Sequence, residues 1–355
     1  MNNLFEHQSV RRVLALTLVL FFAAVTTSEA ATFRAQKRRF KRITLTNAVA
    51  TEIYLRAQAF NKTMPDGRVV QMWGFAQDSS FGALDGTLSS PGPLLTVPVG
   101  NPNIVIHLDN NLPEPISIVI PGIPEVGGMA PVRNGDGRMR SFTHETPAGN
   151  TTASNYVFTL KPGTYLYQSG THQQVQVQMG LYGGVIMNSA ANVAYQGTQA
   201  YDSQVTVFFS EVDPDLHDAV AANNYGPGKA VTSTIDYHPR YFLINGEPFR
   251  TTGGFDANLA AGATNSRILV RFFNTGLRTL APVTQGLYMT VLAEDGNLYP
   301  FPKEQYGLLL PAMKTMDAFI QPTAAGSYPI YDRRLSLTNS TTPNGGYLRY
   351  LVVNP

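Results

Sequence analysis

The chain has no cysteine among its 355 residues. This absence excludes disulfide bonds and any site that depends on a thiolate, whether as a nucleophile or as a soft metal ligand. Charge is also scarce, because only 14% of the residues are charged and the formal net charge is +2. The composition therefore gives no sign of a dominant electrostatic partner.

Familiar catalytic motifs are absent as well. The sequence contains no Gly-x-Ser-x-Gly elbow, no phosphate-binding loop, no Gly-x-Gly-x-x-Gly, no His-Glu-x-x-His and no EF-hand calcium loop. No two histidines are separated by a single residue. These absences argue against the common hydrolases, nucleotide-binding enzymes and zinc proteases.

Long apolar runs are missing except for one near the N-terminus. Residues 13–24 are apolar apart from Thr17, and they follow Arg11 and Arg12. Small residues at Ser28 and Ala30 then offer a cleavage site, so we expect residues 1–30 to be a signal peptide and the mature protein to be secreted or periplasmic. An uncleaved membrane anchor is the alternative, but the run falls short of the ~20 apolar residues that a span requires.

A basic segment follows the expected cleavage site, and we treat residues 31–44 as a basic N-terminal arm. Such an arm is either a solvated, disordered tail or a tether to an anionic surface such as lipid or cell-wall polymer. We expect no nucleic-acid partner, because no aromatic stacking platform accompanies the arm. Its basic residues are Arg34, Lys37, Arg38, Arg39, Lys41 and Arg42.

The rest of the chain has the pattern of short strands joined by turns. Apolar and polar residues alternate over 104–108, 156–160 and 204–209, and the chain holds 31 Gly and 24 Pro. Alternation with period two, interrupted by Pro-Gly and Asn-Gly pairs, predicts antiparallel β-sandwiches. A helical period is found only around 215–224.

Two domains are predicted, over residues 45–195 and 196–355. Each ends in a Gly-rich apolar strand, GLYGGVIMN at 180–188 and GGYLRYLVVN at 345–354. These two similar endings suggest an internal duplication. No long linker is apparent between the domains, so we expect them to pack against each other.

Two motifs resemble the first domain of the multicopper oxidases. Where that family has Ser-Ile-His-Trp-His-Gly, residues 117–122 read SIVIPG; where it has Gly-Thr-Tyr-x-Tyr-His-Ser-His, residues 163–170 read GTYLYQSG. The resemblance implies an all-β fold of two tandem cupredoxin-like Greek-key β-sandwich domains. It also implies that four copper-binding histidines are replaced, by Val119, Pro121, Gln168 and Gly170.

The second half resembles the middle domain of the same family, which binds no copper, and the family's third, copper-bearing domain is missing. A type 1 copper site needs a cysteine thiolate with two histidines. The trinuclear cluster needs His-x-His pairs, because residues two apart lie on one face of a strand. We therefore expect no cofactor, or copper if there is one. Enzymatic activity stays uncertain, and if present the resemblance implies a multicopper-oxidase-type oxidoreductase.

Five histidines follow the expected cleavage site. His144 and His172 flank the replaced motif and are the candidates for a weak copper site. Aspartates cluster near His217 just before the predicted helix, where helix capping explains them without an ion. The five are His107, His144, His172, His217 and His238.

Three hypotheses remain from the sequence. The first is a secreted relative of the copper oxidases without catalysis, acting as a binding or structural component. The second is a subunit whose partner, a separate copper-bearing cupredoxin chain or a second copy, completes the assembly. The third is a weak copper-binding module that uses His144 and His172.

Overall fold

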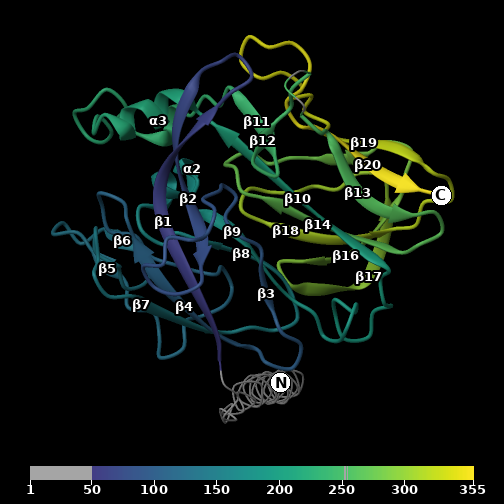
Figure 1. Cartoon of the computed structure of the whole chain (residues 1–355), viewed down its shortest axis with the longest axis horizontal. Helices are drawn as coiled ribbons and strands as arrows, with labels where there is room; N and C mark the ends of the chain where they lie inside the picture. Colours follow the sequence, from purple (N-terminus) through teal and green to yellow (C-terminus); the bar gives the residue numbers. More distant parts are fainter. Residues whose placement is uncertain (1–49, 252, 254) are drawn as a thin grey trace, which may run out of the picture. The chain divides into compact units, whose positions relative to one another are not determined.

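The computed structural model describes residues 50–251, 253 and 255–355. The predicted signal peptide and basic arm lie outside the described residues. Strands dominate the described part, from β1 (Thr51–Thr63) to β20 (Leu348–Asn354), as Figure 1 shows. The predicted all-β fold class is confirmed. No helix in this part of the chain is long and apolar enough to cross a membrane.

The first half of the described chain forms a β-sandwich. Besides β1 its strands are β2 (Val69–Asp78), β3 (Leu95–Val97), β4 (Asn103–Asn110), β7 (Ser154–Thr159), β8 (Gly163–Gln168) and β9 (Tyr182–Met187). One sheet has the strand order β2-β1-β4-β7 and the other the order β3-β9-β8. A small separate hairpin joins β5 (Val132–Arg133) to β6 (Met139–Ser141).

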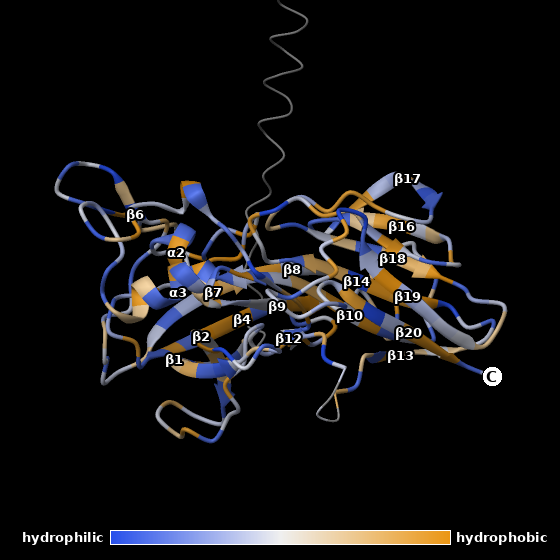
Figure 2. Cartoon of the chain, turned by 90° about the horizontal axis from the view of Figure 1, so that it is seen from above, coloured by the Kyte–Doolittle hydropathy of each residue, from blue (hydrophilic) through white to orange (hydrophobic). Residues whose placement is uncertain are grey.

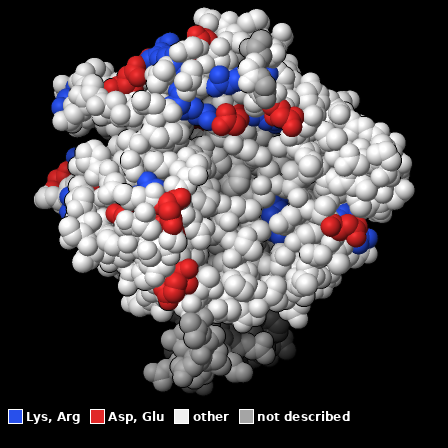
Figure 3. All heavy atoms as spheres, in the orientation of Figure 1, with Lys and Arg blue, Asp and Glu red and all other residues white. Residues whose placement is uncertain are grey.

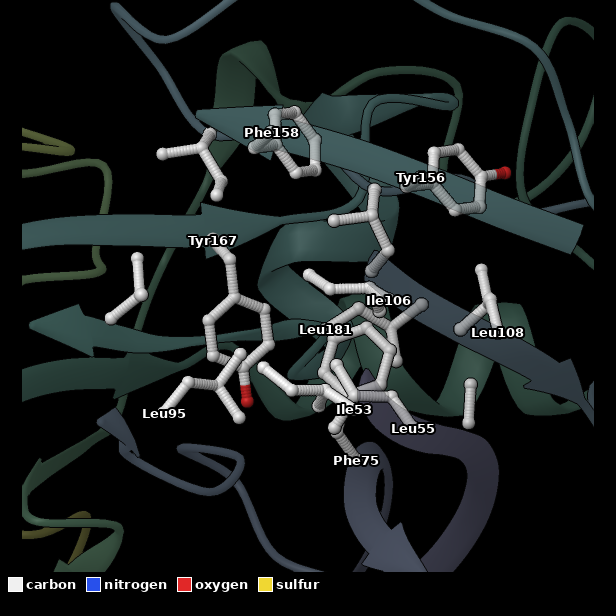
Figure 4. Packing of buried hydrophobic residues seen from close by; sticks show 14 of the residues in the cluster. Ile53, Leu55, Phe75, Leu95, Ile106, Leu108, Tyr156, Phe158, Tyr167 and Leu181 are labelled. Carbon is white, nitrogen blue, oxygen red and sulfur yellow. The ribbon is translucent and has the colours of Figure 1, made fainter. Parts of the chain in front are cut away.

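The core of this sandwich follows from the alternation in its strands. Ile104 and Ile106 of β4 are fully buried, as the period-two pattern predicts. Phe158 of β7 is buried in the same cluster. Tyr167 and Val185 come from the facing sheet, so both sheets supply the core. Figure 4 shows Tyr167 and Phe158 among these packed side chains.

The second half forms another β-sandwich with its own core. Its larger sheet has the order β12-β11-β10-β14-β18-β16-β17, and its smaller sheet the order β13-β20-β19-β15. The larger sheet consists of β10 (Ser203–Val212), β11 (Tyr241–Ile244), β12 (Glu247–Pro248), β14 (Ile268–Asn274), β16 (Met289–Glu294), β17 (Asn297–Gln305) and β18 (Thr315–Ile320). The smaller one adds β13 (Asn258–Ala263), β15 (Pro282–Thr284) and β19 (Gly326–Asp332) to β20.

Strand pairing in the second sandwich repeats that of the first. β1 pairs in parallel with β4 and antiparallel with β2, and β10 pairs in parallel with β14 and antiparallel with β11. In the facing sheets, β3 is parallel to β9 and β13 is parallel to β20. This shared topology supports the duplication that the two strand endings suggest.

A buried asparagine recurs at the same place in both halves. Asn110 ends β4, and its Nδ2 donates to three backbone carbonyls at 2.9, 3.2 and 3.0 Å. Asn274 ends β14, and its Nδ2 donates to three carbonyls at 2.8, 3.0 and 3.0 Å. In each case Oδ1 accepts from the backbone N–H two residues further on, at 3.0 Å. Each asparagine thus fastens the end of its strand to two neighbouring loops.

A buried polar network joins the two sandwiches. Thr164 of β8 donates to Oδ2 of Asp317 at 2.7 Å and accepts from Nη1 of Arg271 at 2.6 Å. Tyr195 donates to the same carboxylate oxygen at 2.5 Å. Burial raises the pKa of Asp317, an effect that the charge of Arg271 only partly offsets. Side chains from both halves are therefore needed to satisfy this network.

Apolar side chains make a second connection between the halves. Phe208 of β10 and Phe273 of β14 stack with ring centroids 4.0 Å apart. They pack in one cluster with Leu166 of β8 and Ile186 of β9. Figure 2 shows hydrophobic residues along β8 and β14, the strands that carry these contacts. The expectation that the two halves pack against each other agrees with this contact.

One helix is where the sequence predicts it, and a second is not predicted. α3 (Pro214–Ala221) begins one residue before the expected range of 215–224. α2 (Gln173–Met179) is a helix that the sequence pattern does not predict. Its sequence QQVQVQM alternates with period two, which favours a strand. Tertiary packing overrides that pattern, because residues from Val175 to Met179 are all buried. A short 3₁₀ turn, η1 (Thr234–Asp236), completes the helical structure.

Candidate functional site

The structure brings the four replaced ligand positions together. Val119 and Gln168 face each other in an antiparallel bridge: each backbone N–H donates to the other's carbonyl, at 2.9 and 3.0 Å. Gly170 adjoins Val119, and Pro121 lines the same hollow as Val119 and Gln168. The residues that the resemblance assigns to one copper site thus do share one site.

These residues do not fit a copper ion. Val119, Pro121 and Gly170 have no side-chain donor atoms, and the amide of Gln168 is a poor substitute for imidazole. A side chain at position 170 would also lack room, since a Cβ there would lie 2.7 Å from Cγ1 of Val119 and 2.8 Å from Oγ of Ser117.

Three buried hydroxyl groups lie next to the replaced positions. Oγ1 of Thr171 lies 3.0 Å from both Ser117 Oγ and Ser141 Oγ, which are 3.1 Å from each other. The backbone N–H of Gly170 also donates to Ser117, at 3.1 Å. Because these hydroxyls satisfy one another, the cluster fixes the loop geometry without an ion.

An apolar pocket of about 500 Å³ occupies the surface at these positions. Ile120 and Phe158 are buried in its wall, whereas Met129 and Phe142 are 42% and 48% exposed. No charged residue lines it. The lining consists of Val119, Ile120, Pro121, Gly122, Ile123, Pro124, Met129, Phe142, Phe158, Gln168 and Gln173. Its volume falls within the ~300–1,000 Å³ of small-molecule sites.

Gln168 is the polar group set deepest in this wall. Gln168 is only 5% exposed, and its Oε1 is buried without a hydrogen-bond partner among the described residues. Both backbone groups of Gln168 are engaged by Val119. Gln173, the other amide of the lining, is half-buried at the start of α2.

The two candidate copper histidines lie in different surroundings. His144 stacks on Tyr156 with ring centroids 4.2 Å apart, and its Nδ1 lies 3.4 Å from Oε1 of Glu125. His172 precedes α2 with a left-handed φ of 38° and lines an adjoining groove of about 820 Å³, which shares Phe142 and Gln173 with the apolar pocket. Between residues 50 and 355, wherever the structure is described, no group of three or more His, Cys, Asp or Glu side chains could hold a metal. A site using His144 and His172 stays a prediction.

The remaining histidines have structural contacts. His107 of β4 stacks on Tyr54, and its ring nitrogens lie against Asn155 and Glu52. His217 of α3 is buried, and burial lowers its pKa despite hydrogen bonds to two backbone carbonyls. The backbone N–H of His238 donates to an aspartate at 2.8 Å.

Capping explains one aspartate of the cluster near His217, as expected, whereas Asp215 and Asp218 form ion pairs with Arg240 and Arg68. Oδ1 of Asp213 accepts from the backbone N–H of Asp215 at 3.0 Å, so Asp213 is the N-cap of α3. Pro214 follows at the first helical position, where its missing N–H costs nothing.

Sequence reasoning found the replaced positions but missed the pocket walls. Met129 and Phe142 belong to loops whose place in the fold depends on tertiary contacts. Phe142 is held by its backbone N–H, which donates to the carbonyl of Gly170 at 3.0 Å. Two exposed large apolar side chains in loops next to a conspicuously altered motif were the available signal.

Comparisons with known proteins agree with this architecture. Residues 82–192, which include all four replaced positions, match the family model of multicopper oxidase. No curated protein matches the sequence. The resemblance that the two motifs indicate is confirmed by this match and by the similar folds of solved multicopper oxidases and laccases.

Solved structures cover most of the chain. The blue copper oxidase from Nitrosomonas europaea is 18% identical, with a TM-score of 0.66, over 86% of this chain and 86% of that one. Copper nitrite reductase from the same organism is 16% identical, with a TM-score of 0.60, over 86% of this chain and 94% of that one. The laccase from Botrytis aclada is 22% identical, with a TM-score of 0.60, over 86% of this chain but 54% of its own. At such identities the likeness shows the fold.

Proposed function

We propose that this protein is an exported binding protein without oxidase activity, built on the frame of the multicopper oxidases. One observation carries the proposal: three of the four positions that the resemblance assigns to copper ligands, Val119, Pro121 and Gln168, line an apolar pocket here. Function depends on the site rather than the fold. A pocket without charged groups, and with walls of aliphatic and aromatic side chains, favours an uncharged apolar ligand.

Absence of oxidase activity is tested by metal analysis together with an assay. Purified protein should hold less than one copper per chain after incubation with Cu²⁺ and desalting. It should oxidise ferrous ions and phenols no faster than the same copper in buffer. Tightly held copper with turnover above that blank would overturn the proposal.

Ligand binding is tested with an uncharged apolar fluorescent probe, N-phenyl-1-naphthylamine. We expect saturable binding that Phe142→Asp weakens at least five-fold, because the new charge stands at the entrance of the pocket. Leu309→Asp is the matched control, since Leu309 is 64% exposed and does not line the pocket. Equal binding by both variants would place the probe elsewhere.

A partner subunit is the second candidate function. The exposed side chains of Met129 and Phe142 beside the pocket favour it, because a partner's apolar surface would cover them. The partner would be a copper-bearing cupredoxin chain or a second copy of this protein. Light scattering over a range of concentrations tests the second copy, which Phe142→Asp should dissociate. A monomer at all concentrations would exclude it.

Export is proposed from the sequence of residues 1–30. Mass spectrometry of protein recovered from the host's extracytoplasmic fraction should find Ala31 as the first residue. The basic arm would then begin the mature chain and is proposed to bind anionic surfaces. Around the described body, Figure 3 shows acidic and basic residues in small separate groups on a mostly uncharged face. That face offers no broad basic surface for nucleic acid.

A further inference from the structure

We propose that the apolar pocket selects uncharged ligands that carry a hydroxyl group, and that Gln168 accepts the hydrogen bond from that group. The inference rests on the proposed binding function and adds the chemical class of the ligand. It depends on Gln168, a polar residue that is only 5% exposed and that lies in a mostly apolar wall.

The first step concerns the unpaired oxygen. Oε1 of Gln168 is buried and has no partner among the described residues. Buried polar atoms in folded proteins are nearly always paired, so an unpaired one needs an explanation. A ligand that donates a hydrogen bond supplies that explanation, because it would restore the bond that water gives this oxygen in the unfolded chain.

The second step concerns what else at this point could recognise a ligand. The backbone N–H and carbonyl of Gln168 are both bonded to Val119, at 3.0 and 2.9 Å. Recognition therefore falls to the side-chain amide. Oε1 is buried as it stands, so a ligand in the pocket meets it only after a half-turn about the Cγ–Cδ bond exchanges it with Nε2, a rotation that the broad terminal torsion allows.

The third step concerns the ligand's charge. The lining contains no Lys, Arg, His, Asp or Glu side chain. An ammonium or carboxylate group would lose its hydration there without gaining a counter-ion. An uncharged donor pays far less for desolvation. Among such donors a hydroxyl on a compact apolar body fits both the walls and the single deep acceptor.

The test uses two isomers, hexan-1-ol and methyl pentyl ether, titrated by calorimetry into the mature protein. Both have the same atoms and both accept hydrogen bonds, but only the alcohol donates one. We expect the alcohol to bind roughly 5- to 15-fold more tightly, the value of one hydrogen bond in a buried site. This comparison needs no variant, so it holds even if changes at position 168 impair folding.

The variant Gln168→Met removes the amide and keeps the length of the side chain. It should abolish the preference for the alcohol while retaining affinity for the ether within about two-fold. Gln173→Met is the matched control, because that amide lines the same pocket from a half-buried position. The control should keep the preference.

The outcomes separate the two proposals. If neither isomer binds the parent protein, the proposed apolar binding function fails. If both bind equally well to the parent, or if Gln168→Met keeps the preference for the alcohol, the pocket exists but the assignment of Gln168 is wrong.

Discussion

Val119 occupies the space that a side chain at position 170 would need. A Cβ on Gly170 would lie 2.7 Å from Cγ1 of Val119, a distance that real Cβ contacts do not reach. Two of the four replaced copper positions therefore depend on each other. The valine fits because its neighbour is glycine, and a histidine at position 170 requires the side chains of Val119 and Ser117 to move.

Gly170→His alone should destabilise the protein by about 1–3 kcal/mol, because it overpacks a closed site. Adding Val119→Ala should recover part of this loss. Urea unfolding of the parent, both single variants and the double variant measures the coupling. Additive effects would show that the two side chains do not compete for the space.

Asn110→Ala and Asn274→Ala should each destabilise the protein by about 2–4 kcal/mol. Each change leaves two backbone carbonyls without a donor, because the third carbonyl of each set also accepts from a backbone N–H. Asn297→Ala is the control, since its Nδ2 makes an exposed bond to one carbonyl and should cost under about 0.5 kcal/mol. A loss equal to that of the control would show that the buried amides are dispensable.

Arg271→Met should destabilise the protein by about 3–5 kcal/mol, because it leaves the buried carboxylate of Asp317 without its cation. Arg271→Met combined with Asp317→Leu should lose less than the single variant, since no buried charge then remains. Denaturant unfolding of the four proteins forms the cycle. A double variant less stable than Arg271→Met would contradict this reasoning.

His217 should make the protein less stable as the pH falls below 6.5. Burial lowers the pKa of His217 in the folded state, so below its ordinary value of 6.5 the unfolded chain binds a proton that the folded chain does not. One such proton costs at most about 1.4 kcal/mol per pH unit. The loss of stability begins near pH 6.5 and ends at the lowered pKa of His217 in the folded state.

Unfolding free energies at pH 7.5 and 5.5 test this dependence. The difference between the two pH values should be smaller in His217→Gln than in the parent, because glutamine does not titrate. Carboxylates that titrate in this range contribute equally to both proteins and cancel. An unchanged difference would remove His217 as a cause.

Local patterns in the sequence were sufficient for the strands and several turns. The alternation around Ile106 predicts β4, and Asp295-Gly296 predicts the tight turn between β16 and β17, where both residues have positive φ of 48° and 73°. The same rule fails at Gln173–Met179, where five consecutive residues from Val175 to Met179 are buried. Local rules describe elements with one face toward solvent and one toward the core, and consecutive burial removes the advantage of a period-two pattern.

The candidate site was only half predictable. The replaced positions could be found because their flanking residues resemble a known motif. The pocket could not, since its entrance depends on where the loops of Met129 and Phe142 come to rest. The unpaired state of Gln168 depends on the fold in the same way, because no sequence pattern states which atoms lack a partner.

The shared aromatic stack has a consequence for how this chain can be divided. Phe208 and Phe273 lie in the second sandwich, yet they pack against Leu166 and Ile186 of the first. A gene fragment encoding either half would yield a polypeptide with an exposed apolar surface, and with Arg271 or Thr164 deprived of its hydrogen-bond partner. We therefore expect each half, when expressed alone, to aggregate.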